Sequence, residues 1–125
     1  MGYTAIGNGS WQSDWIPTFT GFSANPTNVV FRYLLIGKIC FCELSLTAGT
    51  SNATSFTITL PFTANVTGQV CMMRIVDNSA FSNTPGRIST NAGSNVADCY
   101  PFQATAAWTA SGTKASLGMF FYEIA

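Results

Sequence analysis

Residues 33–46 read YLLIGKICFCELSL, an apolar run that contains a Gly-Lys pair and two cysteines one residue apart. Apolar residues on both sides of Gly37-Lys38 predict two neighbouring β-strands joined by a tight turn or a bulge. Alternate residues of a strand share a face, so Cys40 and Cys42 are expected to lie on one side and Ile39 and Phe41 on the other.

The two cysteines of this run are better explained as structure than as chemistry. Residues i and i+2 of a strand lie ~6.7 Å apart with parallel Cβ directions, at or beyond the reach of a disulfide. Zinc sites need a second cysteine pair or histidines, and this sequence has no histidine. We therefore interpret Cys40 and Cys42 as buried apolar thiols and predict neither a metal nor a cofactor. A bridge between Cys71 and Cys99 stays open.

The rest of the chain also alternates with the period of a β-strand. Residues 55–62, SFTITLPF, place apolar residues on one side and hydroxyl residues on the other, and Pro61 is expected to end the strand. A further strand is expected in 68–78, and a final hairpin around Ser111-Gly112. Pro85-Gly86 predicts a turn in which Gly adopts a positive φ.

These segments predict the fold class and the domain organisation. No segment of helical length shows an apolar stripe with caps. Strands that recur about every ten residues predict an all-β antiparallel sandwich or barrel of about seven to nine strands. Residues 1–15 are expected to form an N-terminal arm and 16–125 a single β-sandwich domain.

Several of the expected strands are apolar on both faces, which a two-sheet sandwich of one chain does not cover. Only 8% of the 125 residues are charged, with five basic and five acidic side chains. Both features predict that a second copy of the chain covers part of the surface. The candidate interface residues on these strands are Ile39, Phe41, Met73, Ile75, Phe120 and Tyr122.

The same composition argues against other classes of function. Without histidine there is no Ser-His-Asp triad or Cys-His dyad, so we expect no enzyme. A carboxylate pair from Glu43 and Glu123 is the remaining catalytic alternative, although strand-end exposure or pairing with a cation explains each residue equally well. A neutral chain predicts no nucleic-acid partner. No stretch approaches the ~20 apolar residues of a membrane helix, so no membrane insertion is expected.

Aromatic residues concentrate near the start of the chain. Trp11, Trp15, Phe19 and Phe22 are candidate anchoring or interface residues. Alternatively, these aromatic side chains fill the ends of the sandwich, or exposed members of the group stack on sugars.

Four motifs together resemble a known β module of tailed-bacteriophage virion proteins. They are WQSDWIPTFTGF (11–22), FRYLLIGKICF (31–41), TITLPF (57–62) and WTASGTKASLGMFFYEIA (108–125). The likeness extends in order over residues 11–125. The resemblance implies a jelly-roll-like β-sandwich that forms homotrimers, with no fixed catalytic residues.

Three functions are considered, of which the resemblance implies the first two and the first is favoured. The chain is expected to be a capsid decoration (cement) protein at the virion surface, which binds the major capsid protein or another virion protein. This function is favoured because the expected arm before the sandwich is short and the sequence shows no fibre shaft. The second is the receptor-binding head of a tail fibre or spike that recognises host surface glycans, with loop asparagines as polar contacts. The third is a free lectin-like or glycan-degrading sandwich.

Overall fold

The computed structural model describes residues 10–68, 70–102 and 106–125, and within them every regular element is a β-strand. The strands are β1 (Phe19–Thr20), β2 (Phe22–Ala24), β3 (Thr27–Ile36), β4 (Ile39–Thr47), β5 (Gly49–Ser51), β6 (Thr57–Thr59), β7 (Val70–Asp77), β8 (Ala80–Phe81), β9 (Gly86–Thr90), β10 (Val96–Tyr100) and β11 (Thr113–Glu123). The predicted all-β class is therefore confirmed.

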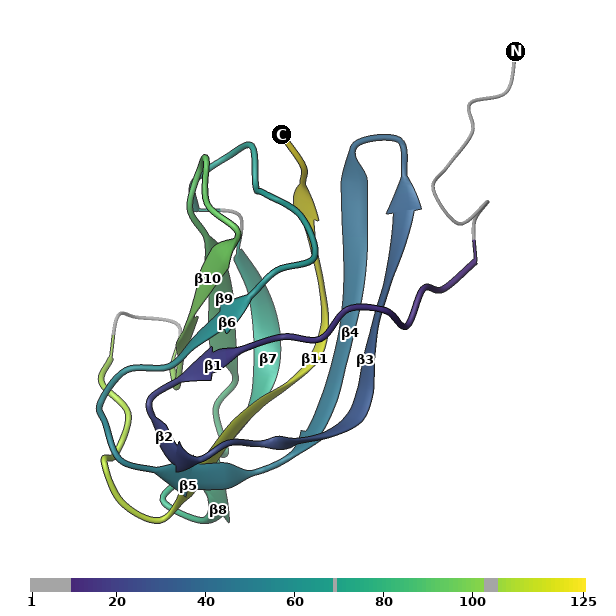
Figure 1. Cartoon of the computed structure of the whole chain (residues 1–125). Coiled ribbons are helices and arrows are strands. Elements are labelled where there is room, and N and C mark those ends of the chain that lie inside the picture. The colour runs from purple at the N-terminus through teal and green to yellow at the C-terminus, as the bar shows by residue number, and fades with distance from the viewer. Residues whose placement is uncertain (1–9, 69, 103–105) are drawn as a thin grey trace.

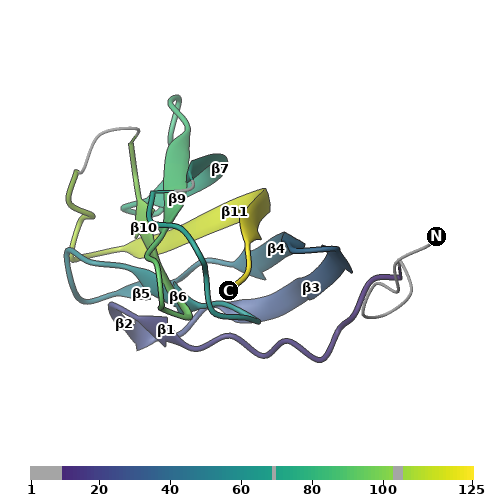
Figure 2. The ribbon, with the colours of Figure 1, turned by 90° about the horizontal axis from the view of Figure 1, so that it is seen from above.

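All the strand pairs are antiparallel, and the main path of the sheet runs β1-β6-β10-β9-β7-β11-β4-β3. Strands β2, β5 and β8 extend the sheet at its lower end in Figure 1. The sheet curls into a half-barrel, as the view from above shows (Figure 2). The β3-β4-β11 wall and the β9-β10-β6 wall enclose the core between them, an arrangement consistent with a sandwich.

The hairpin of β3 and β4 forms as the opening stretch predicts. Its register pairs Tyr33 with Cys42 and Ile36 with Ile39, which leaves Gly37-Lys38 as a two-residue loop. Gly37 has φ 58°, the left-handed value that a hairpin turn with Gly at its first loop position requires. Cys40 and Cys42 are buried on the core side, and all four cysteines are free thiols.

The N-terminal strap, which we define as residues 11–18, crosses the open side of the half-barrel (Figure 1). At one end the backbone N–H of Gln12 donates to the Tyr33 carbonyl at 2.7 Å, and the reverse bond is 2.9 Å. At the other end the N–H of Thr59 donates to the Thr18 carbonyl at 3.1 Å. The strap thus joins the two edges of the curled sheet. The boundary expected at residue 15 is corrected, because the chain belongs to the body from Gln12 onward, and 1–9 lie outside the described residues.

Two turn predictions are also corrected. Gly86 does not have a positive φ but begins β9, where an added Cβ would lie 2.3 Å from the Tyr100 carbonyl oxygen. Gly is thus suited here to close packing rather than to a left-handed turn. The hairpin expected around Ser111-Gly112 has only its second arm, because residues 106–112 contain no strand and β11 pairs instead with β4, β5 and β7.

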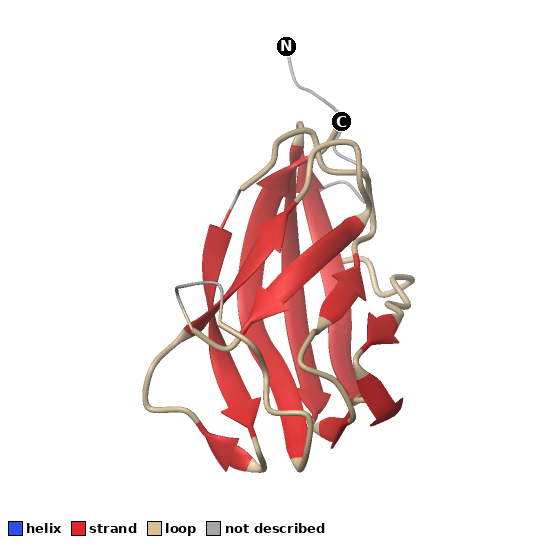
Figure 3. Ribbon diagram, turned by 90° about the vertical axis from the view of Figure 1, so that its left-hand side faces the viewer, coloured by secondary structure: helices blue, strands red, loops and turns tan. Residues whose placement is uncertain are grey.

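The strand count is eleven among the described residues rather than the expected seven to nine. Figure 3 shows the ribbon as strands joined by loops. The difference comes from strands of two or three residues, such as β1, β5 and β8. Such segments are too short to show a periodicity, because an alternation is recognised only over four or more residues.

Candidate contact face

The convex side of β3, β4, β11 and β7 carries an apolar surface that one chain leaves uncovered. We call it the outer face and define it by the side chains Leu34, Ile36, Ile39, Phe41, Met72, Arg74, Met119 and Phe121. Met72, Met119 and Phe121 are 67%, 56% and 53% exposed. Protein contact surfaces are enriched in aromatic, Met and Arg side chains, and the outer face has this composition.

Strand register makes the outer face continuous. Leu34 of β3 lies opposite Phe41 of β4, and Phe41 lies opposite Phe121 of β11. The rings of Phe41 and Phe121 are 5.7 Å apart between centroids. Side chains in directly opposed positions touch across neighbouring strands. The three side chains therefore form an apolar row that runs across three strands.

The charged groups of this face are few. Arg32 Nε donates to Glu43 Oε2 at 2.5 Å, and the Arg32 guanidinium lies 4.6 Å from the centre of the Trp11 ring. The Arg74 guanidinium lies 3.9 Å from the centre of the exposed Phe81 ring. Glu43 thus neutralises the charge of Arg32, whereas Arg74 contacts an aromatic ring and keeps its positive charge.

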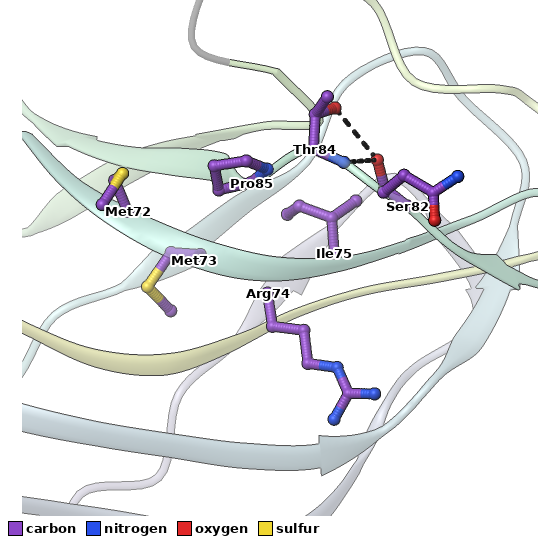
Figure 4. A pocket seen from close by; sticks show the side chains of 8 residues that line it. Met72, Met73, Arg74, Ile75, Ser82, Thr84 and Pro85 are labelled. Carbon is purple, nitrogen blue, oxygen red and sulfur yellow. Dashed lines mark hydrogen bonds between the residues drawn. The ribbon is translucent and has the colours of Figure 1, made fainter.

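Two hollows flank Arg74. The first, of about 350 Å³, is lined by Met72, Met73, Ile75 and the loop 82–85 as well as by Arg74. In Figure 4 the hydrogen-bonded hydroxyl groups of Ser82 and Thr84 lie on one side of this hollow and Arg74 on the other. The second hollow, of about 270 Å³, lies between Arg74, Glu43 and Met119. A partner surface can therefore place an anionic group on the Arg74 guanidinium and a projecting side chain in a hollow beside it.

The predicted interface residues divide between the two sides of the sheet. Ile39 and Phe41 lie on the outer face as expected. Met73, Ile75, Phe120 and Tyr122 do not, because each is at most 2% exposed and belongs to the core of the single chain. The prediction for these four residues is wrong because β7 and β11 are apolar on both faces, so hydrophobicity does not reveal which face points inward. Their neighbours Met72, Met119 and Phe121 are the outward residues.

The predicted anchoring aromatics mostly fill the open side of the half-barrel. The Trp15 ring packs against Phe31 and Phe120, and its Nε1–H donates to the Thr59 carbonyl at 3.0 Å. Phe19 and Phe22 are half-buried and pack against the core. Only Trp11 lies apart from this cluster, against Arg32. Trp15, Phe19 and Phe22 thus belong to the packing of the single chain rather than to an exposed anchoring face.

The carboxylates considered for catalysis are each engaged within the chain. Glu43 binds Arg32, and Glu123 accepts a hydrogen bond from Asn65 Nδ2 at 2.9 Å. In the β4–β11 register Glu43 lies opposite Met119, four residues from Glu123. At ~3.3 Å per residue the two backbone positions are ~13 Å apart, beyond the ~5–9.5 Å between the carboxyl groups of glycosidases.

A scan against protein-family models finds no match to this chain, and a search of curated proteins finds no relative. The described residues contain no helix of the length and hydropathy that a membrane crossing requires.

Proposed function

We propose that this chain is a non-enzymatic structural protein of a tailed-phage virion, in which it acts as a homotrimeric capsid decoration protein. The jelly-roll-like topology and the threefold assembly are part of this proposal. The observation that carries it is the outer face, where Leu34, Phe41 and Phe121 form a continuous row beside exposed methionines. Apolar surface of this extent gains free energy when another copy removes it from water.

Three further features support the proposal. The chain has five basic and five acidic residues, few for the surface of an isolated monomer. The four sequence motifs resemble a trimeric β module of virion proteins. A trimer matches the local threefold positions of a capsid, where it contacts several capsid subunits at once. Binding only to the assembled shell then stabilises the shell by mass action.

The proposal is tested first by the mass of the purified chain in solution. Multi-angle light scattering should give three times the mass of one chain, whereas a stable monomer would contradict the proposal. Quantitative mass spectrometry of purified particles of the encoding phage should then give a copy number on the order of hundreds per capsid, with three chains for each threefold position that a trimer occupies. A few copies on isolated tails would instead indicate the receptor-binding head, and absence from particles would exclude both.

A further inference from the structure

The acidic residues of the chain differ in how they are bound. All five lie within the described residues, and each is hydrogen-bonded to a side chain of its own chain. Glu43 is bound by Arg32, Asp77 by Thr109, Asp98 by Asn91 and Glu123 by Asn65. Asp14 is the only exposed acidic residue of the five, and its contact with the Tyr33 hydroxyl leaves most of its acceptor sites open.

The basic residues, all of them described, differ in the same way. Arg32 is paired with Glu43, Lys114 is buried, and Arg87 is half-buried against the ring of Tyr100. This leaves Lys38 and Arg74 exposed. Lys38 is at the tip of the β3–β4 hairpin and lines neither hollow of the outer face, whereas Arg74 lines both.

The surroundings of Asp14 and Arg74 are complementary in shape as well as in charge. Ile16, two residues from Asp14 in the strap, is 85% exposed, more than any other large apolar side chain among the described residues. Arg74, in contrast, borders hollows that are lined by Met72, Met119 and other apolar side chains. A projecting Ile beside a carboxylate therefore fits an apolar hollow beside a guanidinium.

We propose that the strap of one copy docks on the outer face of the next, with the Asp14 carboxylate on the Arg74 guanidinium and Ile16 in a hollow beside it. This inference rests on the proposed function, because it names the two surfaces that meet in the assembly. A closed ring of three copies is heterologous, so each chain must contribute two different and mutually complementary patches. The strap and the outer face are two such patches.

The local chemistry favours this contact. The guanidinium of Arg74 is held against the Phe81 ring, which limits its motion before an anion arrives. A planar guanidinium can bind both oxygens of a carboxylate, and surrounding apolar side chains exclude water from such a pair. A pair that is desolvated in this way contributes more to specificity than an exposed one.

The test is a charge swap in the full chain, read out as molar mass against concentration by light scattering. Arg74→Glu and Asp14→Lys should each raise the concentration of half-dissociation by about tenfold or more. The double variant with both changes should restore association to within about threefold of the wild type, because the pair is re-formed with reversed polarity. Ile16→Ser should weaken association as well, and Lys38→Glu is the matched control that should not.

The outcomes separate this inference from the proposed function. A wild-type chain that is monomeric at every concentration overturns both. If Arg74→Glu leaves the trimer intact, only the docking of the strap on the outer face is overturned. The same holds if the double variant associates no more strongly than the single variants. Equal weakening by Lys38→Glu would also overturn it, since that result reflects net charge alone. Thermal unfolding of each variant at a concentration where it is monomeric establishes that it is folded.

Discussion

Lys114 is the least expected residue of the core. It is fully buried, and its Nζ donates to the carbonyls of Ala53 and Ser55 at 2.7 and 2.8 Å. The Phe22 ring centre lies 4.9 Å from the same nitrogen. Burial lowers the pKa of Lys114 from its ordinary value, and the charge of Asp77 opposes this shift. The ammonium group thus fixes the loop before β6 at the cost of its own desolvation.

This shift predicts how stability changes with pH. Between the lowered pKa of the folded state and the ordinary lysine value, the unfolded chain binds more protons than the folded chain, so the contribution of Lys114 to stability rises with pH. Lys114→Met should lose about 1–3 kcal/mol at neutral pH, because two carbonyls lose their donor. Urea denaturation at about pH 7, 8.5 and 10 should show this difference from the wild type widening. A difference that is constant or narrows would contradict the prediction.

The four thiols should differ in reactivity. Burial raises the pKa of the Cys42 and Cys99 thiols, and Cys40 is fully buried beside Cys42. Cys71 is half-buried, and its Sγ lies 3.5 Å from the backbone nitrogen of Phe121. Because the reactive species is the accessible thiolate, iodoacetamide should label Cys71 first in the native protein. Mass spectrometry of the labelled peptides checks this order, and equally fast labelling of Cys42 would contradict it.

At the scale of elements, the strap decides whether the curled sheet is closed. The strap pairs with the edge strand β3 through Gln12 and Tyr33, and at its other end it leads into β1, the opposite edge strand, which pairs with β6. Trp15 provides its main apolar contact, against Phe31 and Phe120 of the β3-β4-β11 wall. The strap is thus a structural part of the domain, and it also places Asp14 and Ile16 on the surface.

Two tryptophans of the strap provide a matched comparison. Trp15→Ala should lower the free energy of unfolding by about 3–5 kcal/mol, because it removes a buried indole that packs on Phe31 and Phe120 and donates to the Thr59 carbonyl. Trp11→Ala should lower it by about 1 kcal/mol or less, since Trp11 is half-buried and contacts Arg32. Urea denaturation of both variants at the same protein concentration makes the comparison. Equal losses would mean that the strap is not held by Trp15.

At the scale of the molecule, the C-terminal part of β11 presents a different surface to each side of the sheet. Phe120 lies opposite Cys42 and faces the core, whereas Phe121 lies opposite Phe41 and faces outward. The inner surface stabilises the single chain, and the outer one stays exposed in it. In the assembly that we propose, folding and association therefore depend on different sides of the same strand.

These neighbouring phenylalanines test that separation. Phe120→Ala should cost about 3–5 kcal/mol of unfolding free energy. Phe121→Ala should cost about 1 kcal/mol or less in the monomer but should weaken self-association. Denaturation at a concentration that favours the monomer, together with light scattering at higher concentration, measures both effects. If Phe121→Ala destabilised the monomer as much as Phe120→Ala and left the mass unchanged, the outer face would not be the contact surface.

How far the sequence alone determines this protein depends on the contrast between the two faces of each strand. Where polar and apolar residues alternate, as in SFTITLPF, or where a Gly-Lys pair interrupts an apolar run, the residues themselves indicate the strands, the hairpin and the buried side. Where both faces are apolar, as in β7 and β11, only tertiary packing decides that Met73 and Phe120 point inward and Met72 and Phe121 outward. Packing also created the strap and β1, because their bonds join residues about 20 to 40 positions apart and leave no local pattern.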